Sequence, residues 1–139
     1  MDKHVIQNKL LSLKRCIERI ESKIPDNIEA FINNYDLQDI VMMNLQRSIQ
    51  ISVDIAAHIS SELDVSVPST MAESFQVLFD NSIVSKETSE RMKKSVGLRN
   101  IAVHEYTSLN WDVVYSVAKT NLNDFRDYAS EIVQWLEAN

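Results

Sequence analysis

Four polar residues near the end of one expected helix carry the reactive side chains of this sequence: Arg99, Asn100, His104 and Tyr106. A guanidinium is a permanent cation whose planar fork matches the oxygens of a phosphate. An imidazole titrates near neutral pH and can accept or donate a proton. Together they are the minimum needed to cleave RNA without a metal ion. His104 would act as base on a ribose 2′-hydroxyl or as acid on the leaving oxygen, and Arg99 would stabilise the charge on phosphorus.

The spacing of these residues limits how they can meet. In a regular helix Asn100 and His104 share a face, whereas Arg99 and His104 do not. Arg99 must therefore reach around the helix, or the helix must end before His104. Acid–base cleavage uses two proton-transfer groups, so the second is either His104 of another copy in a symmetric dimer or Tyr106. The same spacing is also typical of an ordinary helix C-terminus, where basic side chains are favourable.

The charge of the chain is partitioned along the sequence. The formal net charge is −6, from 14 basic and 20 acidic residues, which by itself argues against a nucleic-acid partner. Residues 86–104, however, carry five basic and two acidic side chains, and residues 1–25 carry six and three, a net charge of +3 in each segment. Residues 26–85 and 105–139 have net charges of −8 and −4. The basic segments can present a local anion-binding surface. Candidates for contacts with RNA phosphates are Arg91, Lys93 and Lys94.

A polar strip follows one face of the second expected helix, with members three, four and four residues apart. The strip consists of Arg47, Gln50, Asp54 and His58. It is either a solvated or internally paired surface, or the lining of a site contributed by another segment. In the second case Arg47, Asp54 and His58 would support the reactive residues.

The histidines and cysteines form no metal-binding pattern. His4, His58 and His104 are far apart in the sequence, and Cys16 is the only cysteine. The single glycine, Gly97, also excludes phosphate-binding and dinucleotide-binding loops, which need two or three glycines. We therefore expect no metal ion and no cofactor.

Apolar periodicity predicts five helices and no sheet. One glycine and two prolines leave little of the turn chemistry that hairpins need. Isoleucine and leucine recur every three or four residues in the first helix, which Pro25 ends. The second helix is apolar on more than one side, as expected for a central helix or a dimer interface. The expected helices span residues 3–23, 37–63, 71–80, 85–103 and 111–136. Since no linker or repeat interrupts them, residues 1–139 are expected to form one all-α domain.

The sequence also bears on where the protein is found. The N-terminus lacks the basic and apolar segments of a secretory leader. No uncharged apolar run approaches the roughly 18 residues that a membrane span needs, and one cysteine cannot form a disulfide within the chain. We expect a cytoplasmic protein with no membrane partner.

The residues around His104 fit the Arg-x4-His-x-Tyr signature of the HEPN superfamily, and a longer set resembles the HepT family of RNase toxins. This set comprises Val67-Pro68, Ala72-Glu73-Ser74-Phe75, Leu78, Ile83 and Val96-Gly97-Leu98-Arg99-Asn100-Ile101-Ala102-Val103-His104-Glu105-Tyr106. In the second helix, Asp54-Ile-Ala-Ala-His58-Ile59 is also similar to that family. The resemblance covers about residues 37–115.

This resemblance implies a HEPN-type helical bundle that forms a homodimer, with the two motifs meeting in a shared cleft. It implies that Arg99 and His104 are needed for metal-independent RNA cleavage and that Asn100 is a polar support. It also implies that a cognate minimal nucleotidyltransferase antitoxin transfers AMP from ATP to Tyr106 and so blocks the toxin. A nucleotide two residues from His104 adds bulk and negative charge where an RNA phosphate must lie.

Two alternatives make different predictions. A non-catalytic adaptor would bind a nucleotide or a partner protein through the same motif, and it should be harmless when expressed alone. If Tyr106 is instead an ordinary packed phenol, no AMP adduct should form.

Gly97 lies two residues before Arg99. In a helix interior a glycine costs about 1 kcal/mol relative to alanine. We therefore expect it to allow the close approach of another helix or of the RNA backbone.

Overall fold

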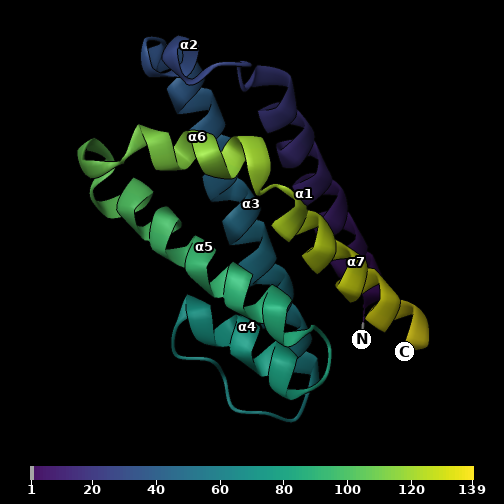
Figure 1. Ribbon diagram of the computed structural model, residues 1–139. Coiled ribbons are helices and arrows are strands. Elements are labelled where there is room, and N and C mark those ends of the chain that lie inside the picture. Colours follow the sequence, from purple (N-terminus) through teal and green to yellow (C-terminus); the bar gives the residue numbers. More distant parts are fainter. Residues whose placement is uncertain (1) are drawn as a thin grey trace.

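The computed structural model describes residues 2–139, and every regular element in them is helical (Figure 1). The α-helices are α1 (Lys3–Lys23), α2 (Ile28–Ile32), α3 (Tyr35–Glu62), α4 (Met71–Asp80), α5 (Lys86–His104), α6 (Trp111–Thr120) and α7 (Asn123–Ala138). A 3₁₀ turn, η1 (Tyr106–Ser108), follows α5. The all-α fold class is confirmed. None of the described helices combines the length and apolar character needed to cross a membrane.

The helix starts follow from local capping. At six of them a side-chain oxygen accepts a hydrogen bond from a backbone N–H of the first turn, which otherwise has no partner in the helix. The residues that cap in this way are Asp2, Asn27, Asn34, Thr70, Ser85 and Asn110. Short polar residues therefore set where the main helices begin.

The expected number of five helices is wrong in two places. The first is α2, a helix of five residues in the connection after α1, which Asn27 caps through a bond from the Ala30 amide. The second is the expected helix over 111–136, which is divided into α6 and α7 at Asn121 and Leu122. Asn121 leaves the helical conformation, and asparagine is a poor helix former that favours caps and turns.

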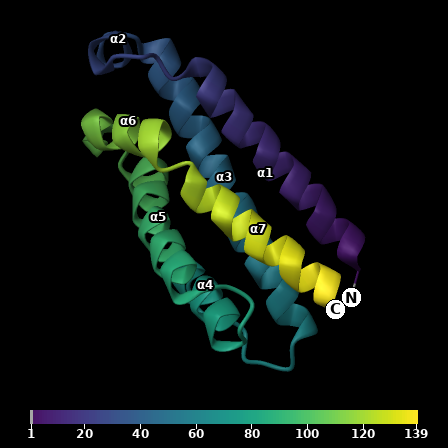
Figure 2. The same cartoon turned by 45° about the vertical axis from the view of Figure 1, so that its right-hand side comes forward.

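The long helix α3 forms the centre of the bundle (Figures 1 and 2). On one side α1 packs along it, on another α4 and α5 lie side by side against it, and α6 crosses near its N-terminal half. The last helix, α7, returns beside α1 and brings the two chain ends together. There the Lys3 ammonium donates a hydrogen bond to the Leu136 carbonyl at 2.9 Å.

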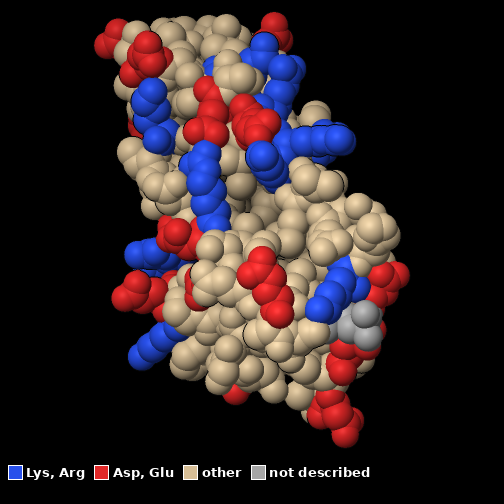
Figure 3. Space-filling model, turned by 90° about the vertical axis from the view of Figure 1, so that its right-hand side faces the viewer, with Lys and Arg blue, Asp and Glu red and all other residues tan. Residues whose placement is uncertain are grey.

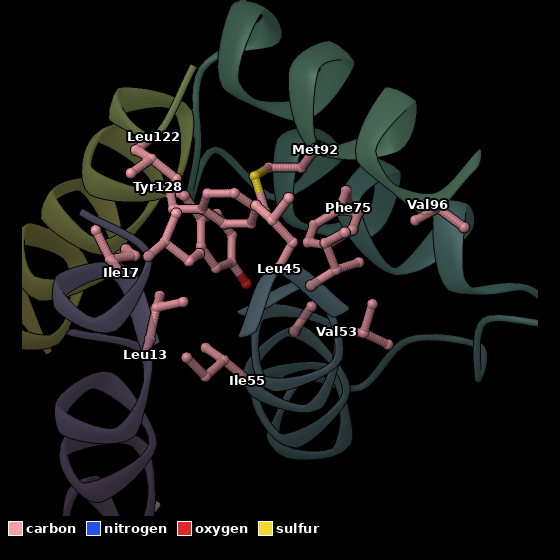
Figure 4. Close-up of a cluster of buried hydrophobic side chains, with 14 of the residues drawn as sticks. Leu13, Ile17, Leu45, Val53, Ile55, Phe75, Met92, Val96, Leu122 and Tyr128 are labelled. Atoms are coloured by element: carbon pink, nitrogen blue, oxygen red, sulfur yellow. The ribbon is translucent and has the colours of Figure 1, made fainter. Parts of the chain in front are cut away.

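The core lies around α3 (Figure 4). Tyr128 of α7 is fully buried there, with its ring edge-on to Phe75 of α4 at a centroid distance of 5.6 Å. Its hydroxyl donates to the Ser52 carbonyl of α3 at 2.8 Å, so the buried phenol has a partner. Apolar side chains on several faces of α3 are buried, among them Leu45, Val53 and Ile55. This confirms the central position that its sequence predicts.

Candidate active site

The motif residues lie at the C-terminal end of α5. His104 is the last residue of the helix, and the Glu105 amide closes the final turn by donating to the Ile101 carbonyl at 2.8 Å. Glu105 then leaves the helical conformation and the chain turns through η1. Because the helix does not end before His104, Arg99 must reach around it, as the spacing requires.

Arg99 is held by two side-chain amides. Its Nη2 donates to Oε1 of Gln50 on α3 at 3.3 Å, and its Nη1 donates to Oδ1 of Asn100 at 3.2 Å. Gln50 in turn donates from Nε2 to Oδ1 of Asp54 at 3.0 Å. The Arg99 Nε is buried and has no hydrogen-bond partner among the described residues. The guanidinium is thus oriented from both helices, and Gln50 links it to the Asp54 carboxylate.

The His104 side chain is exposed at the end of α5. Within residues 2–139 no hydrogen bond restrains its ring, so both ring nitrogens are open to an outside group. Arg99, by comparison, is half-buried. The end of α5 therefore carries a hydrogen-bonded, half-buried cation and a histidine that solvent can reach.

Tyr106 is anchored to α3 and α6. Its hydroxyl donates a hydrogen bond to the Asp39 carboxylate, and its ring lies edge-on to Trp111 at a centroid distance of 5.6 Å. The side chain remains 40% exposed. Partial burial, and then the adjacent Asp39 carboxylate, raise the pKa of Tyr106 well above the ordinary value of 10.0. The phenol is therefore neutral and accessible near neutral pH.

The polar strip of α3 divides into three parts. Gln50 and Asp54 join the Arg99 network, so this part of the strip does contact a second segment. Arg47 is exposed one turn earlier and makes no contact with Arg99. His58 is half-buried, and its Nε2 has no hydrogen-bond partner in the described part of the chain.

The three basic candidates for phosphate contacts differ in their partners, and two of them, Arg91 and Lys94, line the same groove. Arg91 lies 3.8 Å from Asp124 and 3.6 Å from Asp127, both on α7. Lys93 lies 3.6 Å from Glu90 and donates to the Gln76 side chain of α4. Lys94 is exposed on a groove of 500 Å³ between α5 and α6–α7. Arg91 and Lys93 would have to give up internal partners to bind RNA.

Gly97 is exposed, and a methyl group built on it meets no atom within 4 Å. No helix of this chain approaches it closely. If anything approaches Gly97 closely, it is therefore a second molecule, either another copy of the chain or RNA.

Two polar residues of the site were missed as candidates by sequence reasoning. Gln50 was a member of the polar strip but was not assigned a role, and Asp39 carried no signal. Gln50 and Arg99 are 49 residues apart, and Asp39 and Tyr106 are 67 apart. Their contacts come from the packing of α3 against α5 and η1.

No group of three or more histidine, cysteine, aspartate or glutamate side chains that could hold a metal ion occurs in the described residues. Amides hold Arg99, and the His104 imidazole and the Tyr106 phenol follow it in the sequence. Such groups can bind a phosphate and move protons.

Comparisons with known proteins give the family. The model of the ribonuclease HepT-like family matches residues 13–132. The mRNA nuclease HepT of Shewanella oneidensis is 40% identical over 128 residues, which cover 92% of this chain and 96% of that protein. The tRNA nuclease HepT of Aphanizomenon flos-aquae is 26% identical over 132 residues, covering 95% and 90% of the two chains.

A solved structure agrees with this similarity. It is the tri-AMPylated Shewanella oneidensis HEPN toxin in complex with an MNT antitoxin, with a TM-score of 0.88 and 39% identity. The match covers 94% of this chain and 97% of the other. By sequence and by structure, the chain belongs to the ribonuclease HepT-like family.

Proposed function

We propose that this protein is the toxin of a toxin–antitoxin pair and a metal-independent endoribonuclease. The observation that carries the proposal is the arrangement at the end of α5, where amides orient Arg99 and His104 is exposed on the same helix. The related proteins are named as nucleases of mRNA and of tRNA, so the class of substrate proposed here is RNA.

The chemistry follows from these groups. The ribose 2′-hydroxyl attacks the adjacent phosphorus as His104 removes its proton, and the bond from phosphorus to the 5′-oxygen breaks. A second acid returns a proton to that oxygen, which leaves a cyclic phosphate and a 5′-hydroxyl. Arg99 stabilises the charge that develops on the phosphate oxygens.

Gln50 gives Arg99 its orientation without neutralising its charge. A carboxylate in direct contact would pair with the guanidinium and compete with an RNA phosphate. The amide instead separates Arg99 from Asp54 while linking both. Asp54 therefore acts on the position of Arg99 through Gln50.

The second proton-transfer group is the reason to propose a homodimer. Each chain carries one histidine in the motif, and a symmetric dimer places two copies around one cleft. Large apolar side chains exposed beside the motif support such an interface: Ile101, Val103 and Val113. Burying them against a second copy is favourable.

We further propose that a minimal nucleotidyltransferase antitoxin inactivates the protein by modifying Tyr106. The phenol gives its proton to the adjacent Asp39 carboxylate, its oxygen bonds to the α-phosphorus of ATP, and the bond from that phosphorus to the bridging oxygen breaks, so that pyrophosphate leaves. The modified oxygen no longer has a proton to donate to Asp39, and the new negative charge lies beside that carboxylate. The adduct is therefore expected to turn away from Asp39 and to occupy the space in front of His104.

Growth arrest tests the toxin proposal. We expect the wild-type chain to arrest growth when expressed alone, and we expect Arg99→Ala and His104→Ala to be harmless although they fold. His4→Ala is the matched control, because His4 is also exposed but lies on α1. A harmless wild-type protein would favour the non-catalytic adaptor.

The mass of the intact protein tests the modification. After incubation with ATP and the antitoxin, we expect the wild-type protein to gain the mass of one or more AMP units. Tyr106→Phe should gain none. Tyr35→Phe, which removes another exposed phenol, should still be modified. An adduct on Tyr106→Phe would contradict the assignment.

A further inference from the structure

A second cationic surface lies between α1 and α3, outside the site described above. It is a groove of 580 Å³ whose walls carry three arginines: Arg15 and Arg19 on α1 and Arg47 on α3. All three are exposed. The other lining residues are uncharged: Ser12, Cys16, Ile40, Met43, Asn44 and Ile51. We call this surface the arginine groove.

The charges on α1 are separated by face. Lys14 pairs with Glu18 at 3.9 Å, and Glu21 pairs with Arg126, on the side of α1 that faces α7. Figure 3 shows basic and acidic side chains interleaved over that side of the molecule. In the arginine groove the positive charges are not paired with negative ones, since no carboxylate lines it.

None of the three groove arginines has an ion-pair partner within residues 2–139. The charge of Arg47 also affects a residue of α1. Burial raises the pKa of the Cys16 thiol on α1, and the Arg47 guanidinium opposes that rise. Arg47 of α3 and Cys16 of α1 line the same groove.

The arginine groove and the Arg99 hydrogen-bond network share the helix α3. Arg47 and Gln50 are three residues apart on α3, which places their Cα atoms about one helical turn from each other. Gln50 holds Arg99 by the 3.3 Å hydrogen bond. The residue that holds Arg99 is thus about one helical turn from the α3 arginine that lines the groove.

We propose that the arginine groove binds the phosphate backbone of single-stranded RNA and leads it to Arg99 and His104. This inference rests on the proposed ribonuclease function. Guanidinium forks match phosphate oxygens, and the uncharged floor, where Met43 is half exposed, offers apolar contact to riboses and bases. The groove also explains how an acidic protein binds RNA, because the cations are gathered where no carboxylate opposes them.

Binding and its salt dependence test the proposal. The protein would carry His104→Ala, so that RNA is bound but not cleaved, and the probe would be a labelled single-stranded RNA of about 20 nucleotides. We expect the triple variant Arg15→Gln, Arg19→Gln, Arg47→Gln to bind at least about tenfold more weakly near 0.1 M salt. The slope of log affinity against log salt should fall by about 2, because each phosphate contact to a single strand contributes about 0.7.

The control is Lys14→Gln combined with Lys9→Gln, which removes positive charge from the same helix without touching the groove. We expect it to keep nearly the full affinity and slope. The proposal would be overturned if the triple variant bound RNA as tightly as the protein with the unchanged groove. It would also be overturned if the control variant lost as much RNA affinity as the triple variant. A triple variant that changes the oligomeric state and leaves RNA affinity unchanged would also overturn it, because the groove would then be an interface between copies.

The two proposals can fail separately. If wild-type protein does not cleave RNA, the ribonuclease function fails, whatever the groove variants do. If wild-type protein cleaves RNA and the triple variant binds and cleaves it equally well, only the arginine groove is refuted.

Discussion

At the scale of single residues, the positioning of Arg99 is the feature on which the proposed chemistry depends. A planar cation stabilises a phosphate transition state only when its fork is aimed at the developing charge. Gln50 and Asn100 fix the orientation of the guanidinium, since each accepts a hydrogen bond from one Nη atom. The arrangement leaves the charge of Arg99 free for the substrate.

Gln50→Leu tests this role. The change removes the bond to Arg99 and the link to Asp54, so we expect kcat for RNA cleavage to fall about 10- to 100-fold while KM changes little. Gln46→Leu, one turn away on α3, is the matched control. Thermal unfolding of both variants should stay close to that of the wild type. A Gln50→Leu enzyme with unchanged kcat would show that Arg99 needs no support from α3.

Tyr106 gives a prediction about pH. Its folded-state pKa is raised, so the neutral phenol is favoured and its contacts with Asp39 and Trp111 stabilise the fold at neutral pH. That contribution is expected to be complete below the ordinary phenol pKa of 10.0 and to be lost as the pH rises above it. The measurement is the difference in unfolding free energy between the wild type and Tyr106→Phe as a function of pH. A difference that stays constant through this range would contradict the predicted coupling to Asp39.

At the scale of elements, α5 carries the site and contains the only glycine. Among residues 2–139, no atom lies within 4 Å of the position of the missing methyl group of Gly97. We expect Gly97→Ala to raise the free energy of unfolding by about 1 kcal/mol, because alanine is the better helix former.

The same variant tests what approaches α5 from outside. If a second copy or RNA lies against Gly97, the added methyl group should lower RNA cleavage although the fold is more stable. Chemical unfolding and a cleavage assay on the same preparation measure both effects. Higher stability with full activity would defeat the idea of close approach.

The elements also show what the sequence could predict. The apolar stripes of α1 and α3 define those helices well, because their residues are buried at the expected spacing. The break between α6 and α7 was missed because Ala118, Leu122 and Phe125 keep helical spacing across it. Only the run of poor helix formers around Asn121 could have indicated the break. The short α2 is little more than one turn, too little for a periodic signal.

The residues of the candidate site also fall into two groups, those that the sequence could predict and those that it could not. Arg99, Asn100, His104 and Tyr106 are neighbours in the sequence, so one motif was enough to single them out as candidates. Asp39 and Gln50 reach the site only through the packing of α3, and no local pattern encodes a contact over that separation.

At the scale of the whole molecule, two surface features bear on the proposed partners. The net charge of −6 conceals a surface on which cations gather locally, as in the arginine groove. Ile101 and Val103 are exposed beside the motif, in a position to pack against a second copy.

Ile101→Asp tests the proposed dimer. Because Ile101 is exposed, the change should leave the fold of one chain intact, but a charge buried between two copies is costly. We expect sedimentation to show dissociation to monomers and RNA cleavage to be lost. Leu11→Asp, at a 58% exposed leucine on α1, should leave both unchanged. Dissociation by Leu11→Asp instead would place the interface on the α1–α7 face.

The most direct test of the central claim is RNA cleavage by purified protein in the presence of EDTA. We expect the wild-type protein to cleave RNA under these conditions, because side chains supply the proton transfer and the charge stabilisation in the proposed reaction. His104→Ala should lose about 10²- to 10⁴-fold in rate, as expected when a general acid or base is removed, and Arg99→Ala should be similarly impaired. Cleavage that EDTA abolishes, or a His104→Ala protein that cleaves at the wild-type rate, would contradict the account.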